Sequence, residues 1–581
     1  MKRRGRSCAC GGVAVLLTLI LPCFASAQSP IAVLTGQYNR FRTSANLNET
    51  TLAPSNVSAS SFGLLFTQPV DANIFAQPLY VPGTKINGAL HNVVFVATLN
   101  NSVYAFDADT SQPALWSTNL GKPVHLGTPL EPAIGILSTP VIDIGLSTIF
   151  VVTFTIEGKT PLYRLHALNI LTGAEIAKVP IRGAVPGTGD DSQITPCVSW
   201  NNGVVSPPCI PFKASEQLQR PSLLEGIGHA TIYVAFGTMT STEATSPYHG
   251  WLFGYAYSPG AFQQTMIFNT TTSATQVQPA CSTPANQCGH GSGIWMSGRG
   301  PAFDSTGVYV ATGNGGYGGA GSGNWGESAL RLSGSGVVED HFAPQNYATL
   351  NSNDLDLGDG GVILLVSSNQ TAPNLALVAG KSGGVSLLNR AALGGLTGGN
   401  SGALQTFTAT TSACGSGPGQ SGCYEIHSPA LWNPPSGETM LYVWAQEDVL
   451  RVWDFDPTDN VFRPDANQGK IIAPGYPGAG LAISANGNSN GIVWGTVSSG
   501  FLTPSSLYAF DATNVTKPLW SSTDYWFATK FSIPTVANGK VYVPTSASLA
   551  SAPTPYSPAL RVYGLCGTCA QASRQPAGPE Q

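Results

Sequence analysis

The sequence predicts an all-β protein that folds as one eight-bladed β-propeller. Charged residues make up only 10% of the chain, whereas it contains 67 glycines and 43 prolines, a composition typical of turn-rich β proteins. Eight similar apolar runs recur at intervals of roughly 50 to 80 residues, which is the signature of a repeat architecture. They begin at Val93, Ile149, Ile232, Val308, Leu375, Leu441, Gly491 and Lys540.

Each of these runs predicts the central strand of one blade. The runs are almost continuously apolar, which indicates strands that are buried on both faces, as in stacked blades. The last unit lacks an outer strand before Cys566, and the segment Phe62–Val70 is a candidate to supply it. We therefore expect the propeller to span residues 62–566 and to close into a ring, which removes the free sheet edge.

The N-terminus has the three parts of a secretory signal peptide. Basic residues at positions 2–6 precede an apolar run at 13–21, and Ala-Ser-Ala at 25–27 marks a cleavage site. Lipid attachment at Cys23 is the alternative, but Pro22 fits such a site poorly. We expect a secreted or periplasmic protein without a membrane span, because no later run reaches about 18 apolar residues.

The regions on either side of the predicted propeller have little apolar character. Residues 28–61 are expected to form an extended polar lead-in, and residues 567–581 a disordered tail. Without residues 1–27, which carry four of the 26 basic residues, 22 basic residues face 31 acidic ones, a net charge of about −9. This charge argues against a nucleic-acid partner.

The eight cysteines after residue 27 form four close pairs. In an exported chain this pattern predicts local disulfides; free thiols or a metal site are the alternatives. The last pair is followed by Ala570 instead of the histidine that c-type haem attachment needs, so no haem is expected. The pairs are Cys197/Cys209, Cys281/Cys288, Cys414/Cys423 and Cys566/Cys569.

Two glycine-rich turns and an acidic loop carry the candidate site. Asn314 follows the strand-like run Val308–Thr312, and Lys381 follows Leu375–Ala379. Between them lies a loop with three aspartates, Asp354, Asp356 and Asp359. Amide and carboxylate oxygens suit a hard cation, and clustered carboxylates need a cation or hydrogen bonds to offset their repulsion. The structural alternatives are a hairpin turn at Asn314, turn capping by the aspartates and a surface lysine.

Two motifs resemble those of pyrroloquinoline quinone (PQQ)-dependent alcohol dehydrogenases. YAFDA occurs at Tyr104–Ala108 and Tyr508–Ala512, and Trp116 and Trp520 follow at the same offset. Apart from one inserted residue, this resembles the tryptophan-docking repeat of quinoproteins, which implies that the Asp and Trp residues lock neighbouring blades. The order TGN, DxD and GKxGxxxLLNR at the candidate site also resembles that family, whose fold is the eight-bladed quinoprotein propeller.

The resemblance implies a role for each candidate residue. Asn314 would bind Ca²⁺; Asp354 or Asp356 would be the catalytic base, and Asp354 could also bind the metal. Lys381 would contact the PQQ quinone. Trp295 would stack on the cofactor, although its spacing favours a blade-packing role. Glu243 would be the glutamate that binds Ca²⁺, although its offset along the sequence differs from the family pattern. Glu327 is a further carboxylate in reserve.

Two function classes follow from the resemblance. The first is an exported quinoprotein that oxidises an alcohol or sugar and passes electrons to an external acceptor. The second is a non-catalytic propeller scaffold that binds other proteins, as in outer-membrane assembly factors. The chain has no two adjacent cysteines, whereas many family enzymes carry a vicinal disulfide over the cofactor. This departure favours the scaffold, and the acidic loop with its lysine turn favours the enzyme.

Overall fold

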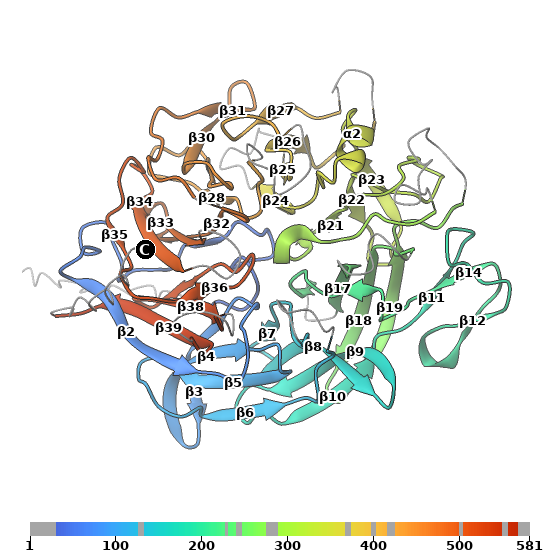
Figure 1. Cartoon of the computed structure of the whole chain (residues 1–581), viewed down its shortest axis with the longest axis horizontal. Helices are drawn as coiled ribbons and strands as arrows, with labels where there is room; N and C mark the ends of the chain where they lie inside the picture. The colour runs from blue at the N-terminus through green and yellow to red at the C-terminus, as the bar shows by residue number, and fades with distance from the viewer. Residues whose placement is uncertain are drawn as a thin grey trace, which may run out of the picture. The chain divides into compact units, whose positions relative to one another are not determined.

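Antiparallel sheets account for nearly all the regular structure of the protein (Figure 1). The predicted signal peptide, Glu243 and most of the predicted tail lie outside the described residues. Among those that are described, no helix has the length and apolar character that crossing a membrane requires. The computed structural model describes residues 31–125, 133–226, 231–239, 247–274, 289–365, 374–396, 402–414, 424–473, 475–498, 504–548 and 556–567.

Eight of the sheets follow one another along the chain and form the blades of the predicted β-propeller. In blades 1, 2 and 4 the strands pair in sequence order, and blade 3 has two short first strands that both pair with its long second strand. The strands of blades 1 to 4 are β3 (Leu79–Ile86), β4 (Ala89–Ala97), β5 (Ser102–Asp107) and β6 (Trp116–Asn119); β7 (Val141–Asp143), β8 (Thr148–Glu157), β9 (Thr160–Asn169) and β10 (Glu175–Pro180); β15 (Gln217–Leu218), β16 (Leu224–Glu225), β17 (Thr231–Thr238), β18 (Trp251–Ser258) and β19 (Ala261–Asn269); and β20 (Ala302–Asp304), β21 (Gly307–Ala311), β22 (Ala329–Leu332) and β23 (Val338–Phe342).

Blades 5 to 8 continue this pattern, and segments from near the N-terminus join the last two of them. Blade 7 gains β1 (Ala45–Asn46) in parallel pairing, and blade 8 gains β2 (Phe62–Pro69). The other strands are β24 (Val362–Leu365), β25 (Leu375–Ala379), β26 (Gly384–Asn389) and β27 (Gln405–Thr408); β28 (Ala430–Trp432), β29 (Met440–Val443), β30 (Arg451–Asp456) and β31 (Val461–Pro464); β32 (Ala479–Asn486), β33 (Ser489–Ser498), β34 (Ser505–Asp511) and β35 (Trp520–Ser521); and β36 (Phe527–Ala528), β37 (Thr535–Ala537), β38 (Lys540–Ser546) and β39 (Ala559–Leu565).

Strand β2 closes the ring, as the sequence predicts. It pairs antiparallel with β39 from Phe62 opposite Leu565 to Pro69 opposite Ala559. The first long strand thus becomes the outer strand of the last blade. Without it, β39 would present an unpaired edge.

The apolar core lies between neighbouring blades. One cluster contains Val94 of blade 1, Ile149 of blade 2 and Tyr542 of blade 8, and another joins Phe150 of blade 2 to Phe236 of blade 3. Every residue of the central strand β25 is buried. Because each central strand packs on both faces, its sequence is continuously apolar instead of alternating.

The tryptophan of the docking repeat reaches the next blade, but the aspartate does not. Trp116 Nε1 donates a 2.9 Å hydrogen bond to the carbonyl oxygen of Ile170 in blade 2, and its ring packs on Gly173. Asp107, by contrast, binds His91 and main-chain amides of its own blade. The expectation that both residues lock blades is therefore wrong for the aspartate, which instead orders its own turn.

The predicted disulfide Cys197–Cys209 is present, with a Cα–Cα distance of 6.1 Å. It lies in an excursion of two small sheets, in which β11 (Ala184–Pro186) pairs with β14 (Cys209–Pro211), and β12 (Cys197–Val198) with β13 (Val204–Val205). Cys414 and Cys566 are each disulfide-bonded as well. Their expected partners, Cys423 and Cys569, lie outside the described residues, as do Cys281 and Cys288.

Residues 31–49, which we call the axial plug, run along the first strands of the blades. The sequence predicts only an extended polar lead-in here. In the structure, positive φ angles at Gln37, Tyr38, Arg42 and Ser44 bend the chain repeatedly. The plug makes a hydrogen bond to every blade or to the loop leading into it: Val33 to Tyr80, Leu34 to Ile142, Arg42 to Leu223, Arg40 to Phe303, Phe41 to Leu364, Thr43 to Leu431, Ser44 to Ile483 and Tyr38 to Val536.

Two buried arginines hold the plug in place. Arg42 donates to the carbonyl oxygens of Pro301, Gly36 and Leu223 and to Thr35 Oγ1. Arg299 donates to the carbonyl oxygens of Arg42, Gly360 and Pro429. Burial lowers the pKa of both arginines to about 9, so they remain charged at neutral pH.

Candidate functional site

Turns at the ends of two central strands meet a loop from blade 5. β21 leads into Asn314 and β25 into Lys381, and the loop between α2 (Tyr347–Ser352) and β24 carries Asp354 and Asp356. Lys381 Nζ lies 2.6 Å from Asp356 Oδ2 and 3.2 Å from Asp354 Oδ1. Asn314 Nδ2 also donates to Asp354 Oδ1. The expected convergence of these four residues is confirmed.

Glu327, which the sequence offered only as a reserve carboxylate, belongs to the same cluster. It is fully buried, and its Oε2 accepts a 2.6 Å hydrogen bond from the amide of Leu357, the residue after Asp356. The main-chain N–H of Asn314 donates a 2.8 Å hydrogen bond to Asp356 Oδ1. Among the described residues, Asn314 Oδ1 and Glu327 Oε1 are buried without a hydrogen-bond partner. We call Asn314, Glu327, Asp354 and Asp356 the oxygen cluster.

The electrostatics of the oxygen cluster show an excess of negative charge. Burial, and then the neighbouring Asp356 carboxylate, raise the pKa of Asp354 and hold that of Glu327 well above its usual range. Burial alone would lower the pKa of Lys381, but Asp356 and Asp354 hold it well above its ordinary value. Lys381 is therefore a permanent cation that neutralises only part of the charge.

The backbone around the oxygen cluster is strained. Asp354 has a φ of 54° and Glu327 a φ of 47°, both in the left-handed region that non-glycine residues rarely adopt. Gly313 could not carry a side chain, because a Cβ atom there would collide with Asp356 Oδ1. Strained backbone of this kind concentrates at ligand sites, where the surrounding structure maintains it.

A second group of ionisable residues lies on the loops that lead into β24 and β28. Asp359, Glu425 and His427 are all buried, and their potential ligand atoms lie within 4.8 Å of one another. Asp359 forms an ion pair with His427 Nδ1, and Glu425 Oε2 lies 3.4 Å from His427 Nε2. Ser297 Oγ donates a 2.6 Å hydrogen bond to Asp359 Oδ1. We call Asp359, Glu425 and His427 the histidine cluster.

Asp359 and His427 stabilise each other's charged forms. Burial tends to raise the pKa of Asp359, but the His427 imidazolium brings it below its usual value. Burial likewise tends to lower the pKa of His427, but Asp359 raises it overall. The sequence placed Asp359 with the other two aspartates, and it gave no indication of Glu425 or His427, which belong to no recognisable motif.

Aromatic rings and a lysine surround the histidine cluster. The ring centroids of Tyr476 and Phe531 lie 5.2 Å and 4.7 Å from that of His427. Lys530 Nζ lies 4.7 Å from the centroid of each of these two aromatic rings. Cationic and aromatic groups together suit a flat anionic ligand.

The remaining sequence candidates have different positions. The Trp295 ring packs against Gly237, at the end of β17, and against Gly293. This packing within blade 3 agrees with the structural alternative for Trp295. Glu243 lies outside the described residues.

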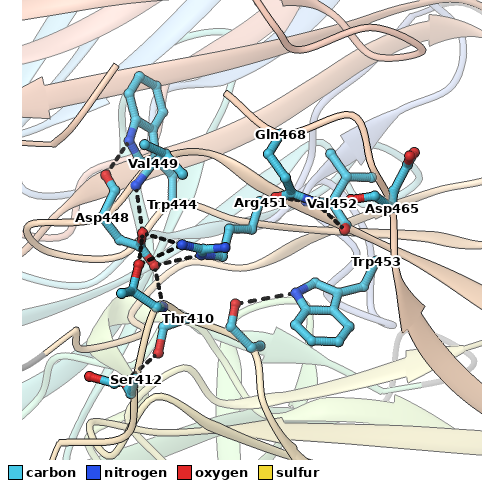
Figure 2. A network of polar contacts seen from close by, with 12 residues as sticks. Thr410, Ser412, Trp444, Asp448, Val449, Arg451, Val452, Trp453, Asp465 and Gln468 are labelled. Carbon is cyan, nitrogen blue, oxygen red and sulfur yellow. Dashed lines mark hydrogen bonds and ion pairs between the residues drawn. The ribbon is translucent and has the colours of Figure 1, made fainter. Parts of the chain in front are cut away.

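A hydrogen-bond network in blade 6 fixes the loop that corresponds to the Lys381 turn (Figure 2). Both Asp448 carboxylate oxygens bind Arg451, at 2.8 and 2.9 Å, and they also accept hydrogen bonds from Thr411 of blade 5. Trp444 Nε1 donates to the carbonyl oxygen of Asp448. Because Gln446 in the same loop donates its amide to the carbonyl oxygen of Glu425, the network also supports the histidine cluster.

Comparison with known proteins shows a fold relationship without a sequence relationship. No protein-family model and no curated protein matches the chain. Solved structures do match, and three of the similar ones are dehydrogenases. A quinohemoprotein alcohol dehydrogenase from Comamonas testosteroni has a TM-score of 0.60 at 14% identity, covering 95% of this chain and 82% of its own.

The other two give the same result. A quinohemoprotein alcohol dehydrogenase from Pseudomonas putida has a TM-score of 0.56 at 13% identity, with coverages of 95% and 82%. A europium-containing methanol dehydrogenase has a TM-score of 0.55 at 13% identity, with coverages of 93% and 99%. The chain thus has the propeller fold of quinoprotein alcohol dehydrogenases. At these identities the likeness shows the fold alone.

Proposed function

We propose that the protein is an oxidoreductase that binds a PQQ-type quinone together with a hard cation and oxidises an alcohol or sugar. The observation that carries the proposal is the convergence of Asn314, Glu327, Asp354, Asp356 and Lys381. On a fold shared with quinoprotein dehydrogenases, the family resemblance implies this arrangement for Asn314, Asp354 or Asp356, and Lys381, and Glu327 adds a further carboxylate to it.

The oxygen cluster fits a hard cation. Ca²⁺ prefers several oxygen ligands from carboxylates and amides, and Asn314 Oδ1 and Glu327 Oε1 are buried oxygens without a hydrogen-bond partner among the described residues. A cation would also offset the repulsion that raises the pKa of Glu327 and Asp354. Since one fold neighbour contains europium, Ca²⁺ and a trivalent lanthanide are the two ions to test.

The two aspartates differ in a way that assigns their roles. The Asp354 side chain is 47% exposed, whereas that of Asp356 is 7% exposed. Asp354 can therefore meet a substrate hydroxyl, and its raised pKa suits a general base. Asp356 accepts a hydrogen bond from the main-chain N–H of Asn314 and forms an ion pair with the Lys381 ammonium. It is therefore suited to positioning Asn314 and Lys381. Asp354 is the proposed base.

Lys381 is the proposed cofactor contact. A bound quinone supplies the hydride acceptor, which no amino-acid side chain provides. Lys381 stays protonated and stabilises negative charge that develops on a nearby oxygen. Electrons would pass to an external acceptor, and the signal-like N-terminus supports action outside the cytoplasm.

The alternative function, a non-catalytic scaffold that binds other proteins, is favoured by two specific observations. Lys381 contacts both Asp354 and Asp356 directly, so part of the cluster is neutralised without any ion. The chain also lacks adjacent cysteines. A scaffold would need neither PQQ nor a cation, which makes binding the decisive measurement.

Calorimetry with PQQ in the presence of Ca²⁺ or La³⁺, followed by dye-linked oxidation of alcohols and aldoses, tests the proposal. We expect D354N to bind PQQ but to lose about 10²- to 10⁴-fold in kcat, and D356N to lose cation affinity. The exposed carboxylate change D459N is the matched control and should alter neither. If PQQ fails to bind with either ion, the scaffold function replaces this one.

A further inference from the structure

The histidine cluster is separate from the oxygen cluster in both residues and chemistry. Asp359, Glu425 and His427 offer one imidazole and two carboxylates, all buried, with ligand atoms within 4.8 Å of one another. None of them accepts or donates a hydrogen bond to Asn314 or Glu327 in the described structure. A mixed nitrogen and oxygen donor set differs from the all-oxygen set that hard cations prefer.

Two buried atoms of the histidine cluster contact only other members of the cluster. Within the described parts of the chain, Asp359 Oδ2 pairs with His427 Nδ1 and His427 Nε2 lies 3.4 Å from Glu425 Oε2, but neither Asp359 Oδ2 nor His427 Nε2 has a hydrogen-bond partner outside the cluster, although both residues are more than nine-tenths buried. Buried ionisable atoms with no other partner are uncommon and point to a missing ligand. Two buried carboxylates also carry two negative charges. An imidazolium neutralises one of them, whereas a divalent ion neutralises both.

We propose that Asp359, Glu425 and His427 bind a divalent first-row transition-metal ion, with Zn²⁺ or Mn²⁺ as the representative ions. Three protein ligands of this type leave a coordination position open for water or another ligand. A cavity of about 20 Å³ adjoins His427, which is room for one water molecule. The proposal does not depend on the proposed quinone chemistry, because it uses different residues.

The surrounding structure holds the three ligands in place. Ser297 Oγ donates a hydrogen bond to Asp359 Oδ1 and so orients the carboxylate, whose Oδ2 pairs with His427 Nδ1. Arg299 donates to the carbonyl oxygens of Gly360 and Pro429, which lie next to Asp359 and close to His427 in sequence. Such supporting contacts orient metal ligands and typically change affinity by about 10- to 100-fold when they are removed.

The test measures Zn²⁺ and Mn²⁺ binding to the full-length protein after chelator treatment and removal of any affinity tag. Calorimetry gives affinity and stoichiometry, elemental analysis gives metal content, and Co²⁺ absorbance reports imidazole coordination. We expect one Zn²⁺ per wild-type chain. E425Q, which conserves shape, should weaken binding at least about 100-fold, and S297A about 10-fold.

E327Q is the matched control, because it changes a buried glutamate of the oxygen cluster in the same way. It should keep wild-type Zn²⁺ affinity, and circular dichroism should show that all variants are folded. The proposal is overturned if the wild-type protein takes up neither ion, or if E425Q binds Zn²⁺ as tightly as E327Q does. Failure of PQQ binding would leave it intact, so the two proposals can fail separately.

Discussion

The axial plug and the oxygen cluster both bury charged groups, but the two regions differ in how many hydrogen bonds those groups receive. In the plug, Arg42 makes four hydrogen bonds, and Glu49 accepts hydrogen bonds from three main-chain amides. In the oxygen cluster, Asn314 Oδ1 and Glu327 Oε1 have no hydrogen-bond partner among the described residues.

This difference indicates that the plug contributes to stability and the oxygen cluster to ligand binding. A buried charge that is fully hydrogen-bonded fixes the structure around it, whereas an unpaired buried oxygen costs free energy that folding must offset elsewhere. The plug therefore supplies rigidity, and the oxygen cluster is where a ligand has the most to contribute. Three substitutions test this contrast.

The largest effect is expected from Arg42→Ala in the plug. Its hydrogen bonds to three carbonyl oxygens would be lost, which should lower the free energy of unfolding by about 3–5 kcal/mol. Denaturant unfolding followed by tryptophan fluorescence measures this loss. Arg40→Ala is the control, since Arg40 is exposed. A loss below about 1 kcal/mol for Arg42→Ala would mean that the plug is dispensable.

A smaller effect of opposite sign is expected when a cation binds the oxygen cluster. Ca²⁺ or La³⁺ at 100 times its Kd should stabilise the wild-type protein by about 2.7 kcal/mol. Glu327→Gln should lose most of this increment, because it removes a buried carboxylate. Arg42→Ala should keep the full stabilisation by the cation, although its free energy of unfolding without the cation is lower than that of the wild-type protein. An equal increment in Glu327→Gln, measured by thermal unfolding, would refute the contrast.

The smallest effect is expected at Glu225, a carboxyl group beside the plug whose charged form is destabilised, unlike the charges within the plug. It ends the first strand β16, and burial and the Asp143 carboxyl raise its pKa to about 8. A raised folded-state pKa contributes stability below the unfolded value of about 4.5, and this contribution is lost as the pH rises through about 8. Glu225→Gln should thus be more stable than the wild-type protein at pH 9 by on the order of 1 kcal/mol, after allowance for partial exposure.

Thermal unfolding of both proteins between pH 4 and pH 9 measures this difference. The two curves should coincide at pH 4, where Glu225 is protonated in both the folded and unfolded states. Parallel curves across the whole range would show that Glu225 titrates normally.

The sequence predicted those features of the fold that repeat. Central strands such as β25 are continuously apolar because both of their faces are buried, and a repeated pattern of this kind is visible without a structure. The closing strand β2 was also predictable, since one unit lacked a partner. The axial plug was not, because Tyr38, Arg42 and Glu49 each have a different partner and form no periodic pattern.

The candidate site was predictable only in part for the same reason. Asn314 and Lys381 stand directly after central strands, so their convergence follows from the repeat. Glu425 and His427 precede β28 in a segment with no repeated spacing, and only the packing of neighbouring loops brings them to Asp359.

The axial plug has a consequence for how the chain folds. Tyr38 donates a hydrogen bond to the carbonyl oxygen of Pro534, 496 residues away, and β2 pairs with β39 at the opposite end of the chain. Neither contact can form until nearly the whole polypeptide has been synthesised. Contacts of such long sequence separation slow folding, and they leave apolar blade faces open to aggregation in the meantime. Ring closure is therefore the step at which chaperones would have most effect, and chains truncated before β39 should never complete it.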